Sequence, residues 1–499
     1  MNNKTKFEVK IKKLNIDSGR GRIVFLNKYC PLISSEGLEG MNRIRVHNNK
    51  TSIITTLNIV NSDLVSPEEI GVSDTTFALL NLKEESKVTI SHIKPLVSFS
   101  AIRAKMRGKE FTEKELIEII ADIVSGRFSD THVAAFCTAC EGVLSEKEIT
   151  FLTQAMVKAG KQIKWRKSTV VDKHCIGGVP GNRTTVIVIP IIAAFGLYIP
   201  KTSSRAITSP SGTADTMEVL APVKLSLEEM KKVVTKEKGC LVWGGAVSLS
   251  PADDIVIQIK REINVDSKGQ MIASILSKKI AAGSNCILID IPVGPTAKVK
   301  NQEEAIELKN IFEKIGKKLG VNIKAIITNG SQPIGNGIGP ALEAKDIVSV
   351  LKNEKNAPQD LREKSIHLAG VILEMSKKVK KGKGEQTARE ILETGKAWGK
   401  FQAICEAQGG MKSIPSAAYT QNITANKSGT VCEIDNKKLS YLAKLAGAPE
   451  NKAAGIYLHK HLNNVVKKDE KIFTIHSESE GELQLALRMA IENEIVKIK

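Results

Sequence analysis

A glycine-rich turn between a β-branched run and a long apolar run is the feature that most constrains this chain. Residues 169–171 (TVV) suit a buried strand, residues 177–181 (GGVPG) permit a tight turn, and residues 186–197 suit a buried helix. The start of such a helix offers unpaired N–H groups to an anion, and Lys173 adds a positive charge. The segment predicts a phosphate cradle, although the same pattern also occurs in α/β proteins that bind no phosphate.

A second polar segment follows at residues 201–215 (KTSSRAITSPSGTAD). It is rich in Ser and Thr hydroxyls, contains one Arg and shows no apolar periodicity. Hydroxyl and guanidinium groups are donors suited to an oxyanion or a sugar. The alternative interpretation is a Ser/Thr-rich loop that caps a helix beginning near Ala214.

These two segments resemble the thymidine and pyrimidine-nucleoside phosphorylase family in its long form, which carries an extra N-terminal domain. Further blocks that resemble this family lie in order at residues 265–267 (VDS), 272–279 (IASILSKK), 293–298 (VGPTAK) and 329–335 (NGSQPIG). The long form includes archaeal-type AMP phosphorylases and bacterial chains classed as thymidine phosphorylases, and DKHC followed by GGVPGNRTT is most similar to the latter. The resemblance implies phosphorolysis of thymidine to thymine and 2-deoxyribose 1-phosphate. Its alternative is phosphorolysis of AMP to adenine and ribose 1,5-bisphosphate.

The chain of 499 residues is too long for one ordinary core, and its patterns predict a multidomain α/β protein. Short alternating runs near the start of the chain predict a small β-barrel-like domain. Thr112 with Glu115 and Ser145 with Glu148 then form capping boxes, which predict the starts of two helices. Later β-branched runs alternate with helical segments. The predicted parts are a β-barrel-like domain (1–93), a helical domain (94–165), a mostly parallel α/β phosphate-binding domain (166–412) and an α+β domain (413–499). By resemblance, residues 251–283 or so rejoin the helical domain.

The resemblance assigns phosphate binding to one set of residues. They are Lys173, Cys175, Ser203 and Thr213, with Thr184 or Thr185 contributing from the start of the helix. Many family members have Ser where this chain has Cys175, and a thiol is a much weaker donor, so that contact is expected to weaken or to pass to a backbone N–H. Two interpretations of Cys175 stay open: an inert substitution, or a reactive thiolate beside Lys173.

The resemblance also assigns contacts with the nucleoside or nucleotide. The residues are Gly178, Ser204, Arg205, Ala206, Ile207, Thr208, Ser209, Thr213, Ser274, Lys278 and Lys298. Pyrimidine-specific members use an Arg, a Ser and a Lys on the base; Ser274 and Lys278 keep two of these, but the Arg position falls near Ile259 or Lys260. Those members also carry His where this chain has Ser209. These departures favour a nucleotide substrate, whereas the whole-length resemblance favours thymidine.

Two residues are candidates for the catalytic acid that protonates the departing base. The resemblance points to Asp266, which could donate a proton near neutral pH only from a buried environment; its alternative role is a turn or N-cap aspartate. His174 is the rival acid, because imidazole titrates near neutrality.

Composition limits the partners. The eight cysteines are mostly scattered in apolar segments, and the Cys137–Cys140 pair has no second pair at zinc spacing, so we expect reduced thiols and no metal. No cofactor is expected, inorganic phosphate being a co-substrate. The apolar stretch at 186–197 is too short to span a bilayer, which predicts a cytoplasmic protein without a membrane partner. By resemblance, the chain forms a homodimer.

The formal net charge of +19 raises the separate hypothesis of a basic polyanion-binding protein on a degenerate enzyme fold. Only 4% of the residues are aromatic, and no basic stretch is interleaved with Phe or Tyr. Because base stacking needs such residues, nucleic acid is not the expected partner.

Overall fold

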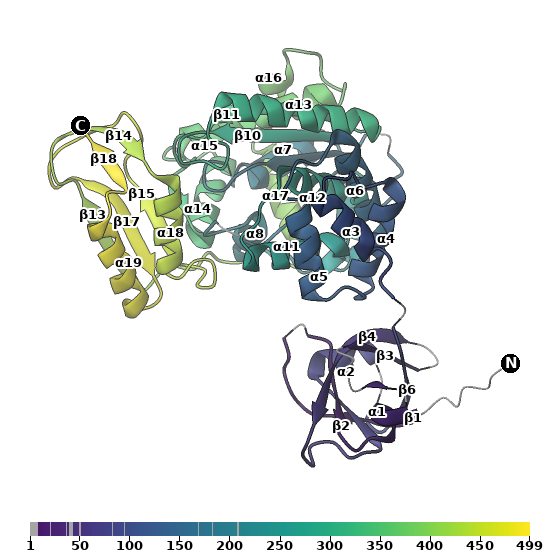
Figure 1. Cartoon of the computed structure of the whole chain (residues 1–499). Helices are drawn as coiled ribbons and strands as arrows, with labels where there is room; N and C mark the ends of the chain where they lie inside the picture. Colours follow the sequence, from purple (N-terminus) through teal and green to yellow (C-terminus); the bar gives the residue numbers. More distant parts are fainter. Residues whose placement is uncertain are drawn as a thin grey trace. The chain divides into compact units, whose positions relative to one another are not determined.

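The computed structural model describes residues 8–19, 21–35, 37–38, 43–48, 51–81, 83–93, 95–167, 169–181, 183–206 and 209–499. The chain forms two compact units, Met1–Val143 with Ile255–Ser267 (unit 1) and Leu144–Asp254 with Lys268–Lys499 (unit 2). Figure 1 shows the elements of both units. The division into four domains predicted from the sequence stays a prediction.

Unit 1 begins with a closed β barrel. Its strands, in barrel order, are β1 (Glu8–Lys13), β5 (Glu69–Val72), β2 (Ile23–Asn27), β4 (Ser52–Val60), β3 (Arg43–His47) and β6 (Lys87–Ser91), with the short helices α1 (Pro31–Ser35) and α2 (Asp74–Leu80). Alternate residues of the strands, such as Val9 and Ile11, point into the barrel core, and this alternation is the sequence pattern that predicted a small β domain.

Helices follow the barrel. Unit 1 contains α3 (Phe99–Met106), α4 (Glu113–Val124) and α5 (Asp130–Ala139), and unit 2 contains α6 (Glu146–Ala159). The capping boxes predicted at Thr112 with Glu115 and at Ser145 with Glu148 are both present and begin α4 and α6. Later in the chain, α11 (Pro251–Glu262) runs across the boundary of the units, and α12 (Lys268–Ala281) packs on α6.

The α/β part of unit 2 is built on parallel strands, as the sequence predicted. β11 (Asn322–Asn329), β10 (Cys286–Val293) and β7 (Val171–Cys175) form one parallel sheet, and β8 (Ile199–Ser203) with β9 (Gly239–Trp243) forms another. A parallel bridge between Val170 and Tyr198 connects the two. The carboxyl ends of these strands therefore share one edge, which is where α/β proteins place their ligands.

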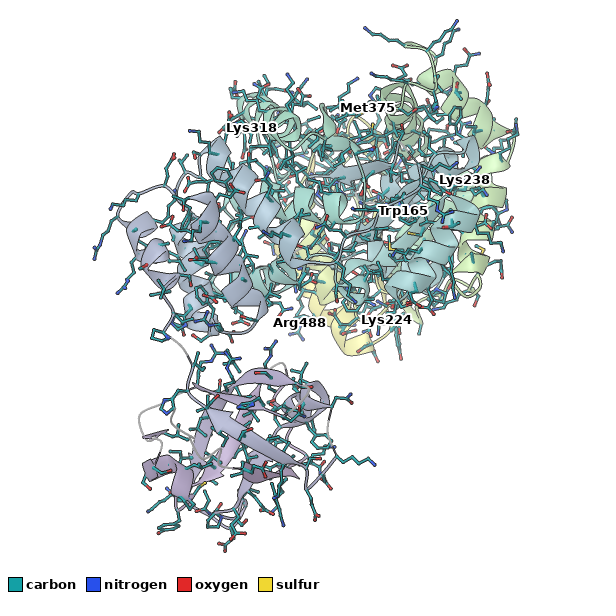
Figure 2. The ribbon with its side chains drawn as sticks, turned by 90° about the vertical axis from the view of Figure 1, so that its right-hand side faces the viewer. Trp165, Lys224, Lys238, Lys318, Met375 and Arg488 are labelled. Atoms are coloured by element: carbon teal, nitrogen blue, oxygen red, sulfur yellow. The ribbon has the colours of Figure 1, made fainter. Side chains whose placement is uncertain are left out.

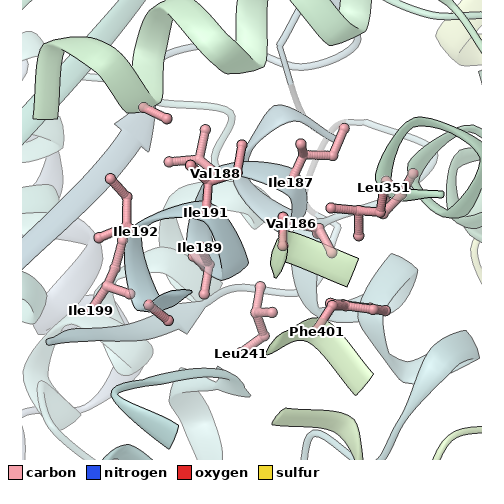
Figure 3. Packing of buried hydrophobic residues seen from close by; sticks show 14 of the residues in the cluster. Val186, Ile187, Val188, Ile189, Ile191, Ile192, Ile199, Leu241, Leu351 and Phe401 are labelled. Atoms are coloured by element: carbon pink, nitrogen blue, oxygen red, sulfur yellow. The ribbon is translucent and has the colours of Figure 1, made fainter. Parts of the chain in front are cut away.

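Helices cover the parallel strands. They are α7 (Thr184–Phe195), α8 (Thr213–Leu220), α9 (Leu227–Glu237), α10 (Gly244–Val247), α13 (Gln302–Lys318), α14 (Pro340–Leu351), α15 (Gln359–Met375), α16 (Gly384–Glu393) and α17 (Lys396–Ala407). Figure 3 shows the central packing: α7 lies among Ile199, Leu241, Leu351 and Phe401. The apolar run at 186–197 is thus a core helix as far as Phe195, and the helix is buried on all sides from Thr184 to Ala193. Nowhere in the described ranges is a helix both long and apolar enough to cross a membrane.

The last part of unit 2 is α+β. One sheet has the order β12 (Gly337–Ile338), β15 (Gly455–Leu458), β17 (Lys471–Ser477) and β13 (Tyr419–Thr424), and the other has the order β16 (Val465–Val466), β14 (Gly429–Ile434) and β18 (Val496–Ile498). The helices are α18 (Asn436–Leu445) and α19 (Glu480–Glu492). Because β12 comes from the glycine-rich stretch at 335–339, that stretch is part of this sheet.

Candidate active site

The glycine turn, residues 176–181, follows β7 at the shared carboxyl edge of the parallel strands. Gly177 has φ +116°, a backbone conformation that favours glycine. A Cβ atom on Gly177 would lie 3.0 Å from Cβ of Lys298, and one on Gly178 would lie 4.0 Å from Cβ of Ser209. The turn is therefore flanked by two of the residues predicted to bind the nucleoside.

Lys173 lies beneath this turn and is fully buried. Its Nζ atom donates to Oγ1 of Thr184 (2.7 Å) and to Oγ1 of Thr185 (3.3 Å), the first residues of α7. The carboxylate of Asp290 is 3.9 Å away. Burial lowers the pKa of Lys173, and the neighbouring Asp290 opposes that shift. A nearby anion would favour the charged form of this amine.

Thr184 makes a second bond that limits its predicted role. Its Oγ1 atom donates to the carbonyl of Gly181 (2.7 Å) while it accepts from Lys173. A hydroxyl has one proton, so Thr184 can donate to phosphate only by giving up the bond to Gly181. Its role as a phosphate ligand stays a prediction, and the structure gives it a second role in closing the turn.

Cys175 ends β7 and faces Asp290 across the sheet register. Its Sγ atom lies 3.8 Å from the carbonyl oxygen of Gly177. Burial, with Asp290 nearby, raises the pKa of the thiol to about 12 despite the opposing Lys173. This favours the inert interpretation of Cys175 over the reactive thiolate.

The hydroxyl loop, residues 203–206 and 209–213 of the described chain, follows β8 at the same edge and ends at the start of α8. The Oγ atom of Ser203 is buried and has no hydrogen-bond partner among the residues that the structure describes. A Cβ atom on Gly212 would lie 2.7 Å from backbone atoms of Ser204, Arg205 and Ala206, so the two ends of the loop are in close contact. Thr213 begins α8 in this arrangement. Ile207 and Thr208, also predicted to bind nucleoside, lie outside the described residues.

His174 is surrounded by positive charge. Burial lowers its pKa well below 6.5, and Lys279, Lys201, Lys173 and Lys278 add to the effect. The imidazole is therefore neutral at physiological pH, able to donate one hydrogen bond but not to act as a preformed imidazolium.

The base-binding candidates Ser274 and Lys278 lie on α12. Nζ of Lys278 is 2.5 Å from Oδ2 of Asp253 and 3.9 Å from Oδ1 of Asp254. Burial would lower the pKa of Lys278, but these two carboxylates outweigh it and the net shift is upward. The neighbouring Lys279 is 3.1 Å from Asp172 on β7, which ties α12 to the strand that carries Lys173.

Comparison with known proteins identifies the family. Three family models match, described as Glycosyl transferase family, a/b domain (residues 167–398), Glycosyl transferase family, helical bundle domain (99–160) and Pyrimidine nucleoside phosphorylase C-terminal domain (430–496). A Legionella pneumophila (strain Corby) protein named "Putative thymidine phosphorylase" is 53% identical over 97% of this chain and 94% of its own. The chain belongs to the thymidine and pyrimidine-nucleoside phosphorylase family. This nucleoside phosphorylase is thus a glycosyl transferase, as its motifs predicted.

Other similar proteins agree with this assignment. Proteins of Maricaulis maris (strain MCS10) and Polaromonas sp. (strain JS666 / ATCC BAA-500), which carry the same name as the Legionella protein, are 48% and 46% identical over 98% and 97% of this chain and 95% of their own length. The crystal structure of anthranilate phosphoribosyltransferase (TrpD) from Thermus thermophilus matches with a TM-score of 0.51, covering 62% of this chain and 99% of that one. At 18% sequence identity, this likeness is one of fold alone.

Arg205 of the phosphorylase is held by carboxylates. Its guanidinium donates to both carboxylate oxygens of Glu218 (2.7 Å each) and to Asp215 (3.0 Å), and it lies over the ring of Trp243. Hydrogen bonds from Arg205 lower the pKa of Glu218 to about 2. Asp215 also accepts from the backbone N–H groups of Ala206 and Gly212. Arg205 thus shapes the hydroxyl loop, and its predicted contact with nucleotide would require it to leave these partners.

Asp266 lies in unit 1, whereas the residues of the glycine turn lie in unit 2. Its side chain is 57% exposed, and Nζ of Lys260 is 3.6 Å from its Oδ1. The predicted role as proton donor requires a buried carboxyl group, so the environment of Asp266 does not support that role, which stays a prediction.

Several residues of the site were missed by the sequence analysis. They are Asp172, Arg183, Lys201, Asp215, Glu218, Lys279, Asp290, Glu343 and Lys364. Asp290 could have been predicted from the sequence, because a single acidic residue inside the buried strand 286–291 needs a polar or charged partner. In the structure its carboxylate accepts a hydrogen bond from Thr328 and lies 3.6 Å from Nζ of Lys364. Among the described residues, no group of three or more His, Cys, Asp or Glu side chains could hold a metal ion.

Proposed function

We propose that this enzyme catalyses the reversible phosphorolysis of thymidine to thymine and 2-deoxyribose 1-phosphate. In this reaction an oxygen of inorganic phosphate attacks the anomeric carbon, the bond from that carbon to the base nitrogen breaks, and the base leaves with a proton or a strong hydrogen bond. Catalysis then requires donors that hold phosphate, contacts that hold the base, and exclusion of water as a competing nucleophile.

The observation that carries the proposal is the unpaired hydroxyl of Ser203 at the same strand edge as Lys173. A buried hydroxyl without a partner is unfavourable, and a phosphate oxygen would satisfy it. The backbone at the start of α7 and the buried ammonium of Lys173 contribute positive potential to the same region. Thr213, at the start of α8, is the other proposed phosphate ligand.

The leaving base is the second part of the proposal. Ser274 and Lys278 on α12 are the proposed base contacts, and Lys298 with Ser209 beside the glycine turn are the proposed sugar-side contacts. We assign to His174 a hydrogen bond from its neutral imidazole N–H to the departing base, because its lowered pKa makes full proton transfer from an imidazolium unfavourable. Cytoplasmic location and a homodimer belong to the same proposal.

A single assay tests the reaction. The protein is incubated with thymidine, uridine or AMP, with and without phosphate, and release of free base is measured. The expected result is phosphate-dependent release of thymine, which Lys173→Ala abolishes. Release of adenine from AMP, with no base released from thymidine or uridine, would show that the substrate is a nucleotide and not thymidine.

Release from none of the three would instead support the basic polyanion-binding protein. In that case binding to heparin would fall steeply with salt. Figure 2 shows that the labelled exposed lysines Lys224, Lys238 and Lys318 lie on different parts of the surface of unit 2.

A further inference from the structure

Arg183 is a fully buried arginine directly before α7. Its Nη2 atom lies 3.5 Å from Oε1 of Glu343, which comes from α14 and is also buried. None of the three guanidinium nitrogens makes a hydrogen bond with a described residue, so Arg183 is held by attraction to buried carboxylates, to Glu343 and also to Asp346. Water does not screen these charges, and removing Glu343 leaves the buried charge of Arg183 less well compensated.

Glu343 reaches a second helix through its other oxygen. Oε2 accepts a hydrogen bond from Oγ1 of Thr216 (3.0 Å), in the first turns of α8; the other acceptor for this hydroxyl proton is the carbonyl of Gly212 (3.2 Å). Thr216 in turn is 2.7 Å from Oγ of Ser211, in the hydroxyl loop. One buried carboxylate therefore contacts both the residue that precedes α7 and a residue of α8.

The two helix starts joined in this way carry the proposed phosphate ligands. Thr184 follows Arg183 directly and Thr213 lies one helical turn before Thr216. We infer that Glu343 is a positioning residue that sets the separation of these two helix starts, acting through Arg183 and Thr216. The inference rests on the proposed function, because it assumes that phosphate binds between the glycine turn and the hydroxyl loop.

The neighbourhood of Glu343 gives it a fixed geometry. The N–H of Gly339 points to Oε1 at 3.4 Å, and a Cβ atom on Gly335 would lie 3.2 Å from Nη1 of Arg183. Gly335 has φ +72° and needs the conformational freedom of glycine there. The glycine-rich stretch at 335–339 is thus packed around the Arg183–Glu343 pair.

The test compares steady-state kinetics of three variants. Thr216→Val removes the hydroxyl at nearly constant volume, Thr216→Ser keeps it, and Glu343→Gln removes the charge that faces Arg183. We expect Thr216→Val and Glu343→Gln to raise the KM for phosphate about tenfold, with the KM for thymidine nearly unchanged. Thr216→Ser should restore the wild-type KM for phosphate.

The control is an ion pair elsewhere in unit 2 whose carboxylate is buried and whose lysine is partly exposed. Glu237 on α9 is buried and lies 2.9 Å from Nζ of Lys400 on α17. Glu237→Gln should lower the melting temperature without changing either KM. If Thr216→Val folds and its KM for phosphate equals that of the wild type, the inference is overturned and Glu343 is structural only. A wild type without phosphorolysis overturns the proposed function and, with it, this inference.

If Glu343→Gln does not fold, the KM for phosphate of Thr216→Val alone tests the inference. This variant is expected to fold because it removes one hydroxyl and no charge. A parallel rise of both KM values in Thr216→Val would also overturn the inference, since general loosening of the site would produce it. Selective loss of phosphate affinity, rescued by Ser, is the result that a merely structural role would not give.

Discussion

The sulfur of Cys175 occupies the space that a side chain at residue 181 would need, because a Cβ atom built on Gly181 would overlap Sγ of Cys175. The same Cβ atom would lie 3.5 Å from Oδ2 of Asp290, which is an ordinary contact, so the overlap is with the sulfur of Cys175. We predict that Gly181→Ala destabilises the protein by about 1–3 kcal/mol, the usual cost of overpacking. Thermal unfolding measures this, and phosphorolysis by the folded variant should also fall because the turn moves.

Gly399 provides the matched control for that substitution. It lies in α17, is exposed, and a Cβ atom there would meet nothing within 4 Å. Gly399→Ala should raise the stability by about 0.5–1 kcal/mol, because alanine loses less backbone entropy in a helix. Equal melting temperatures for Gly181→Ala and the wild type would contradict the packing at Cys175.

The hydroxyl of Thr184 bonds both to the buried ammonium group of Lys173 and to the carbonyl group of Gly181 in the glycine turn. Thr184→Val keeps the shape and removes both the bond from Lys173 and the bond to Gly181. We expect the KM for phosphate to rise about tenfold or more, since a hydrogen bond involving a charged group contributes about 1.5–3 kcal/mol. Thr185→Val, which removes only the 3.3 Å contact with Lys173, should have a smaller effect. The reverse order of the two effects would contradict this assignment.

Much of this site was predictable from local sequence. The strand, glycine turn and helix at residues 171–195 follow from β-branched residues, glycines and an apolar run that are adjacent in the chain. The helix starts at Glu113 and Glu146 follow from capping boxes that span four residues each. Interactions between residues that are close together in the chain can therefore be predicted from a single sequence.

The rest depended on partners that are distant in sequence. Glu343 meets Thr216 across 127 positions, and Thr328 meets Asp290 across 38. Arg205 was predicted to contact nucleotide from the family resemblance, but Glu218 and Asp215 of α8 accept hydrogen bonds from its guanidinium. The sequence shows that Arg205 is a hydrogen-bond donor. Only the fold determines which acceptor groups bond to it.

The thiols give a chemical prediction. The pKa of Cys175 is raised to about 12, so little of its reactive thiolate forms at mildly alkaline pH. Cys432 is exposed, while the other seven cysteines are buried or partly buried. We expect a thiol reagent to modify one cysteine rapidly in the native protein and all eight after unfolding. Cys432→Ser should remove the rapid phase, and rapid loss of activity in that variant would show instead that Cys175 is reactive.

His174 provides a prediction for the pH dependence of the rate. Its pKa lies well below the ordinary value of 6.5, because burial and the four surrounding lysines disfavour the imidazolium. An enzyme that needed this imidazolium as its acid would become faster as the pH falls through 6.5. We predict that kcat does not rise over that range and that His174→Gln, which can still donate from its amide, lowers kcat while keeping the shape of the pH profile. A rise in wild-type kcat toward acid pH that disappears in His174→Gln would mean that the protonated imidazole is the acid and that a bound substrate reverses the effect of the lysines.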